Sequence, residues 1–234
     1  MTTLLAIDGI VIYGVTRSGA AASPGSTFTI PSNDGASYPF SAGDLMILSD
    51  LVQSTTATVP TSVTPPGWTL VGSVTGASSD GKGMRHNLSY KIMVGPEPGT
   101  TVAGMSGTGK SRKNLNTFRV SRPIQSVSVS GYDHISIAYG SSSYGLSIDP
   151  TSLPGNVISI IHMHCETTVL ATPSGITGTS YQMPVDASDT YGSAGVARSF
   201  YSYVPIGGTL ALNEVAMFDS GSFNFIAGAN FSLS

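Results

Sequence analysis

The stretch GDLMILSDLV (residues 43–52) indicates the fold class. Six of its ten residues are apolar, and the turn cluster TPPG (64–67) follows it, which is typical of a buried β-strand. Similar short apolar runs recur along the chain, for example at 5–15, 86–94 and 157–165, and none has the 3.6-residue period of a helix. The sequence therefore predicts an all-β protein, built as an antiparallel β-sandwich or jelly roll.

The composition agrees with this class. Charged residues make up 10% of the 234 residues, against a usual share of about 25%. Glycine (28) and proline (14) are frequent, yet 40% of the residues are hydrophobic, which separates the chain from disordered proteins. The one cysteine, Cys165, excludes an internal disulfide framework. The beginning of the chain lacks a basic signal-peptide region and no apolar run reaches ~18 residues, so we expect a soluble protein without membrane insertion.

The sequence repeats three features in the same order. Residues 43–52 are echoed by GNVISIIHMH (155–164), the turn at 64–73 by TPSGITGTS (172–180), and the aromatic strand at 88–101 by FYSYVPIGGTL (200–210). We expect one domain, 1–234, with two related halves at about 40–122 and 150–234 and an N-terminal strand or arm at 1–30. Each half is expected to give strands to both sheets of the sandwich.

A family resemblance rests on the first half. GDLMILSDL, then PPGWTLVGS, then LSYKIMVGPEPGTT resembles a β-sandwich module of phage virion proteins and some bacterial surface proteins. In that group a Gly-Asp-Leu strand, a Pro-Pro-Gly-Trp turn and a Tyr-Lys strand ending in Gly-x-Pro-Gly follow in this order. The resemblance covers about 43–101 and continues weakly beyond. It implies a structural or adhesive part of a tail or capsid exterior, and no catalytic residues come with it.

GMSGTGKS (104–111) fits the phosphate-loop pattern G-x-x-x-x-G-K-[ST] letter for letter. That motif needs a strand before it and a helix that begins at the Lys-Ser pair. Here the residues after Ser111 alternate with a period of two, which predicts a strand and not a helix. We interpret the stretch as a hairpin tip without phosphate-binding geometry. Its cations Lys110, Arg112 and Lys113 are expected in solvent.

HMHCE (162–166) is the best metal candidate. His162 and His164 are two residues apart on an expected strand, as in the metal sites of cupin-type jelly rolls. A site would need His86 or His134 from another strand, and histidines that hydrogen-bond within a sheet are the alternative interpretation. We expect no cofactor and no bound metal, and we keep a small metalloenzyme that uses His162 and His164 as the weakest functional alternative.

Charge is unevenly distributed. Residues 82–122 hold eight cations and one acid, a net of +7, whereas residues 123–234 hold one cation and seven acids, a net of −6. Solvated loop charges are one interpretation. The other is a contact patch for an anionic surface or for a second subunit. The candidate patch residues are Lys82, Arg85, Lys110, Arg112, Lys113 and Arg119.

Aromatic residues offer two further hypotheses. Trp68 follows a Pro-Pro-Gly turn and is expected to anchor the core with Leu45 and Ile47, whose counterparts in the second half are Ile158 and Ile160. Four tyrosines lie in stretches rich in glycine and serine, a composition that suits adaptable recognition. These candidate ligand-facing residues, expected in exposed loops, are Tyr132, Tyr139, Tyr144 and Tyr191.

The sequence thus favours a non-enzymatic phage virion protein, made in the host cytoplasm and displayed on a capsid or tail exterior. The expected partners are further copies of the chain and other virion proteins, and not nucleic acid. The main alternative is an adhesin module that binds a host-surface glycan or receptor.

Overall fold

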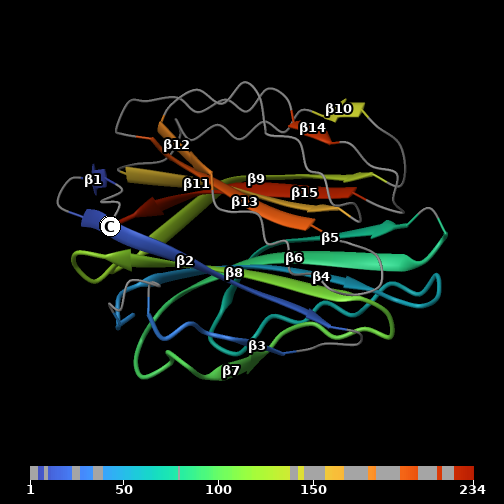
Figure 1. Cartoon of the computed structure of the whole chain (residues 1–234), viewed down its shortest axis with the longest axis horizontal. Helices are drawn as coiled ribbons and strands as arrows, with labels where there is room; N and C mark the ends of the chain where they lie inside the picture. The colour runs from blue at the N-terminus through green and yellow to red at the C-terminus, as the bar shows by residue number, and fades with distance from the viewer. Residues whose placement is uncertain are drawn as a thin grey trace.

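The computed structural model describes residues 5–7, 10–22, 27–33, 39–78, 80–137, 142–144, 156–165, 179–182, 196–204, 215–217 and 224–234. Every regular element in these ranges is a β-strand, and all neighbouring strands pair antiparallel (Figure 1). The all-β class predicted from the sequence is therefore confirmed.

The described strands form two larger sheets and two small ones. The six-stranded sheet has the order β1 (Leu5–Ile7), β2 (Ile10–Ala22), β8 (Ser111–Val120), β4 (Leu45–Gln53), β6 (Gly83–Ile92) and β5 (Thr69–Ala77). The five-stranded sheet has the order β12 (Thr179–Gln182), β13 (Val196–Val204), β11 (Asn156–Cys165), β15 (Asn224–Leu233) and β9 (Val127–Ile137). The small sheets pair β3 (Thr27–Thr29) with β7 (Thr101–Ala103) and β10 (Ser142–Tyr144) with β14 (Val215–Met217). In Figure 1 the pairs β3–β7 and β10–β14 lie on opposite outer sides of the two larger sheets.

The two larger sheets have corresponding strand orders. The order β2-β8-β4-β6-β5 in one corresponds to β9-β15-β11-β13-β12 in the other, and β3–β7 corresponds to β10–β14. Adding seven to each strand number from β2 to β8 gives its equivalent. The echoed stretches 43–52 and 155–164 supply the equivalent strands β4 and β11.

The expectation that each half gives strands to both sheets is wrong. All long strands of residues 40–122 join the six-stranded sheet, and those of 150–234 join the five-stranded sheet. The pairs β5–β6 and β12–β13 join antiparallel strands that follow one another in the chain, which lowers the entropic cost of pairing, whereas β2–β8 and β9–β15 pair over long separations within the same half. Of the two alternatives for the segment 1–30, a strand or an arm, the structure has the strand, because β2 pairs along β8 inside the sheet.

β4 is buried along its whole length. It pairs with β6 on one side and β8 on the other, and its nine residues are all buried. Because strand side chains alternate, Leu45 and Ile47 point to one face while Met46 and Leu48 point to the other. Two separate apolar clusters therefore meet at this strand.

The first cluster, which we call the inner core, combines both larger sheets. Leu45, Ile47, Leu88 and Phe118 come from the six-stranded sheet, and Ile158, Ile160, Ala229, Phe231 and Leu233 come from the five-stranded sheet. Tyr90 meets Phe231 edge to face, with 5.8 Å between ring centroids. The predicted burial of Leu45, Ile47, Ile158 and Ile160 is confirmed.

The second cluster, the outer core, lies on the other face of the six-stranded sheet. It consists of Phe28, Ile30, Phe40, Met46, Leu48, Trp68, Met93 and Leu115. Trp68 is 8% exposed, and its ring meets Phe28 edge to face at 5.9 Å. Trp68 is a core anchor, as predicted.

Replacing Trp68 by alanine should lower the free energy of unfolding by about 3–5 kcal/mol, because the change leaves a large cavity in the outer core. Urea unfolding followed by far-UV circular dichroism measures the loss. Val94→Ala is the matched control, since Val94 is 75% exposed and should change stability little. A Trp68→Ala protein as stable as this control would contradict the assignment.

Candidate functional site

The Gly-Asp-Leu motif fastens the start of β4 to the end of β8. The Asp44 carboxylate is buried, and it accepts hydrogen bonds from the Val120 N–H at 2.9 Å and the Ser41 N–H at 2.8 Å. Burial raises the pKa of Asp44, and these hydrogen bonds oppose that shift. Gly43, at a φ of 90°, packs directly on Pro123. The motif therefore has a structural role.

The other motif residues also make structural contacts. Trp68 N–H donates to Pro65 C=O at 3.0 Å, and Gly67 has a φ of 77°, as the third residue of a type II turn requires. Lys91 forms an ion pair with Glu97. Gly99, at a φ of 79°, donates to the Ile30 carbonyl at 2.8 Å.

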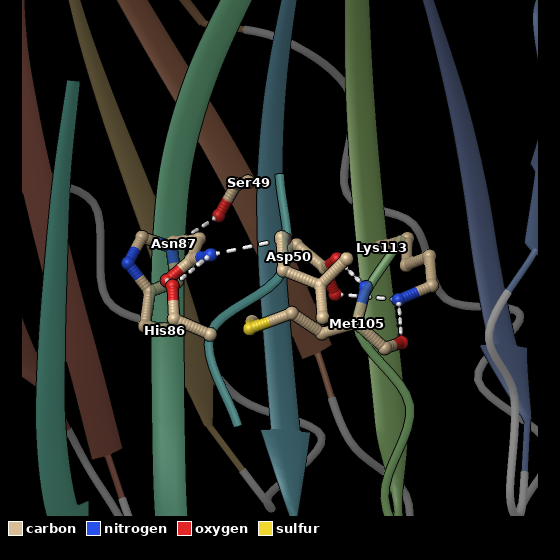
Figure 2. Close-up of polar contacts among 8 residues, drawn as sticks. Ser49, Asp50, His86, Asn87, Met105 and Lys113 are labelled. Carbon is tan, nitrogen blue, oxygen red and sulfur yellow. Dashed lines mark hydrogen bonds and ion pairs between the residues drawn. The ribbon is translucent and has the colours of Figure 1, made fainter. Parts of the chain in front are cut away.

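The outer face of β4 carries a buried ion pair (Figure 2). Lys113 Nζ on β8 lies 2.6 Å from Asp50 Oδ1, and each side chain is 1% exposed. Met105 covers the pair. Its N–H donates to Asp50 Oδ2 at 2.7 Å, and its C=O accepts from Lys113 Nζ at 2.7 Å. Burial raises the pKa of Asp50 and lowers the pKa of Lys113, while the attraction between the two groups opposes both shifts.

The phosphate-loop-like glycines let the chain approach β4 closely. A Cβ on Gly104 would meet Asp50 Oδ2, and one on Gly107 would lie 2.9 Å from the Gln53 carbonyl oxygen. A Cβ on Gly109 would lie 2.8 Å from that same oxygen and 2.9 Å from the Ser54 carbonyl oxygen. Ser111 begins the strand β8, so the predicted absence of a helix there is confirmed.

Further polar contacts lie on β6, beside β4 (Figure 2). On the inner face, the buried Ser49 Oγ and His86 Nε2 are 2.7 Å apart. On the outer face, Asn87 Nδ2 donates to Ser62 Oγ at 3.0 Å and to the Val63 carbonyl at 3.2 Å. Asn87 therefore holds the loop that precedes Trp68, and the Ser–His pair is closed to solvent.

The expected charge patch needs correction. Arg112 and Lys113 are not on an exposed hairpin tip, because both residues are buried on β8. The reason is that β8 begins at Ser111 and runs beside the fully buried β4. Reversing Lys110, Arg112 and Lys113 together would therefore disrupt the fold.

The remaining patch candidates are partly exposed and make local contacts. Lys82 pairs with Asp80 at 2.5 Å, and Arg85 Nε donates to the Pro60 carbonyl at 2.6 Å. Lys110 and Arg119 are half-buried at the two ends of β8. Asp80 and Asp50, which lie outside residues 82–122, therefore neutralise part of the net charge of +7 that this segment has by sequence.

A cleft of about 450 Å³ lies between the edge strands β5 and β9. Each strand is irregular there: the pairing register of β5 shifts between Leu70 and Gly72, and that of β9 shifts around Gly131, which has a φ of 64°. Such bulges redirect side chains. The lining is uncharged and consists of Thr69, Leu70, Val71, Tyr90, Val129, Ser130, Gly131 and Tyr132.

Tyr132 is the candidate ligand-facing tyrosine that lines this cleft. It is half-buried on β9 instead of exposed in a loop, because its ring packs on Gly72 and stacks on His134 at 5.8 Å. Burial, and secondarily the charge of Asp133, raises the pKa of Tyr132 to about 12. Among the described residues, Tyr132 Oη and Ser130 Oγ have no hydrogen-bond partner although both are buried.

Several predicted site residues lie beyond what the structure describes. Tyr139 and Tyr191 are outside the described residues, and Tyr144 is in β10 with an undescribed side chain. His162 and His164 are in β11, opposite Ser199 and Ala197 of β13, and their side chains are likewise undescribed. Among the side chains that are described, no three His, Cys, Asp or Glu residues form a metal-binding group. A metal bound by His162 and His164 stays a prediction.

The sequence reasoning missed the Asp50–Lys113 pair and the Ser49–His86 pair. Their members are 63 and 37 residues apart in the chain, so spacing gives no signal. One signal was present: Asp50 is the one charged residue in a mostly apolar buried strand, and a charge in that setting needs a partner.

Comparison with known proteins assigns no activity to the buried pairs or to the cleft. No family model, no curated protein and no solved structure matches the chain. In the described residues, no helix is long and apolar enough to span a membrane.

Substitutions in the 104–111 stretch separate the structural interpretation from phosphate binding. Lys110→Ala should change the free energy of unfolding by no more than about 0.5 kcal/mol. Gly109→Ala should lower it by about 1–3 kcal/mol, because its Cβ would press on two carbonyl oxygens of the β4 end. Urea unfolding and ATP titration measure both effects. Micromolar ATP binding that Lys110→Ala abolishes would contradict the structural interpretation.

Proposed function

We propose that the chain is a non-enzymatic structural protein of a phage virion, placed on the capsid or tail exterior. The observation that carries this proposal is the structural role of the motif residues on which the family resemblance rests. Asp44, Trp68 and Gly99, which belong to the three parts of the resemblance, hold strand ends, a turn and a core in place. A module whose distinctive residues stabilise its framework suits a building block of a particle.

We further propose that the two larger sheets form one β-sandwich made of two related halves. The inner core, to which both sheets contribute, supports the face-to-face arrangement. The equivalence of β2–β8 with β9–β15 supports halves that begin earlier than residues 40 and 150, because β2 and β9 occupy the same place in their sheets. The first half also contains the small sheet β3–β7, and the second half contains the small sheet β10–β14.

Assembly through the surface follows from the same proposal. We expect contacts with further copies of the chain and with other virion proteins, made by the exposed parts of the sheets and turns. Of the cations first considered, Lys82, Arg85, Lys110 and Arg119 stay in the candidate surface, since Arg112 and Lys113 are buried. The contact is therefore expected to depend less on salt than a patch of six cations would.

A second function, binding of a host-surface glycan, is favoured by the cleft between β5 and β9. Its uncharged lining combines two tyrosine rings and the exposed Leu70 with the hydroxyl of the exposed Thr69. An apolar face beside hydroxyl groups matches a neutral sugar ring. This cleft is what supports an adhesive role over a purely structural one.

The experiment purifies particles encoded by the same genome and measures the chain by quantitative mass spectrometry. A structural protein is expected at many copies per particle, and an adhesin at few. A neutral-glycan panel on the purified protein accompanies the measurement, and Leu70→Ala, which removes an exposed apolar side chain of the cleft, should weaken any binding that is found. Absence of the chain from purified particles would contradict the virion role, whether or not a glycan binds.

A further inference from the structure

The geometry of the Asp50–Lys113 ion pair also suits a covalent reaction between the carboxyl group and the amine. Lys113 Nζ is 2.6 Å from Asp50 Oδ1, and both side chains are 1% exposed on adjacent, register-paired strands. Attack on the carboxyl carbon requires that Lys113 pass one proton to the carboxylate along this hydrogen bond and that the resulting amine shift toward Cγ. Reacting groups held about 3–3.5 Å apart with fixed orientation gain much of the entropic advantage of an intramolecular reaction.

We propose that Lys113 and Asp50 condense into an intramolecular isopeptide bond that joins β8 to β4. This covalent cross-link is a self-catalysed modification and is independent of the function proposed above. It would fasten the central strand of the six-stranded sheet to its neighbour, which suits a protein exposed to mechanical load.

The peptide group of Met105 matches the amide product. An amide has one N–H donor and one carbonyl acceptor, and Met105 offers one C=O at 2.7 Å from Nζ and one N–H at 2.7 Å from Oδ2. An ammonium group has three donors to satisfy, and the contacts to Asp50 and Met105 supply two acceptors. Forming the amide also removes two charges from a buried site, where unsolvated charge is costly.

The environment favours the neutral partners that the reaction needs. Burial raises the pKa of Asp50 and lowers the pKa of Lys113, so a proton passes more easily from the ammonium to the carboxylate. Gly104 lets the covering chain close over both groups, because a Cβ there would meet Asp50 Oδ2 and lie 3.3 Å from Lys113 Nζ. The dry enclosure disfavours the reverse hydrolysis.

The steps balance without a co-reactant. A proton moves from Nζ to Oδ1 along their hydrogen bond, which gives an amine and a carboxylic acid. The Nζ lone pair then attacks Cγ, and the charge that develops on Oδ2 faces the Met105 N–H. A second proton moves from Nζ to Oδ1, the Cγ–Oδ1 bond breaks, and water leaves. The net change is one carboxylate and one ammonium converted to one amide and one water.

The test is the intact mass of the purified, denatured full chain. The expected mass is lower than the sequence mass by one water, and a tryptic digest should contain a branched peptide that joins residues 18–82 to residues 113–119. The full sequence mass would overturn the proposal. A loss of water without the branched peptide would also overturn it, because Asp-Gly pairs such as Asp80-Gly81 lose water as succinimides, which hydroxylamine cleaves while an isopeptide amide survives.

Three variants sharpen the result. Asp50→Asn changes the leaving group to ammonia, so its cross-linked form should have the same mass as cross-linked wild type. Lys113→Met removes the amine and should show its full mass. Lys110→Met is the matched control, which removes a neighbouring lysine and should keep the loss of water. The wild-type mass decides the question even if a variant fails to fold.

Discussion

Burial of β4 on both faces is the constraint on which the rest of the structure depends. A strand in the middle of a sheet has its backbone hydrogen bonds satisfied by its neighbours, but its two faces must each be covered. The inner core covers Leu45 and Ile47, and the outer core covers Met46 and Leu48. The five-stranded sheet covers the inner face of β4, and the β3–β7 pair and the turn before Trp68 help to cover its outer face. The positions of these elements are therefore tied to the burial of this one strand.

The same constraint explains the polar groups near the other end of β4. Asp50 lies on the outer face, where the apolar cover ends, and its carboxylate is enclosed instead by Lys113 and the Met105 peptide. The covering chain can approach β4 this closely only where no side chain lies between the two backbones. Gly104 meets that requirement at Asp50, and Gly107 and Gly109 do so at Gln53 and Ser54, which is why a stretch that matches a phosphate loop letter for letter has a packing role here.

The sequence predicted the parts of the fold that depend on local pattern. Apolar runs and turn residues gave the all-β class, the strand after Ser111 and the burial of Trp68, Leu45 and Ile160. It could not predict which strands share a sheet, because pairing depends on contacts far apart in the chain. The error over Arg112 and Lys113 has the same origin: both follow a Gly-Lys-Ser stretch that is typical of a solvated turn, and the buried partner of Lys113, Asp50, is 63 residues away in the chain. Composition singled out Tyr132 as a ligand-facing residue but placed it in an exposed loop, and the cleft that it lines was not predicted, because the bulges that form the cleft leave no clear sequence signal.

Hydrogen exchange tests the central role of β4 most directly. Exchange of the full chain at neutral pH, read by mass spectrometry on peptic fragments, compares Leu45–Gln53 with the edge strand Thr69–Ala77, which is largely unburied. The β4 amides should exchange slowest among the described strands, because they are released only when both cores open. Exchange of β4 as fast as that of β5 would contradict the account, since it would mean that β4 opens without disturbing the two cores.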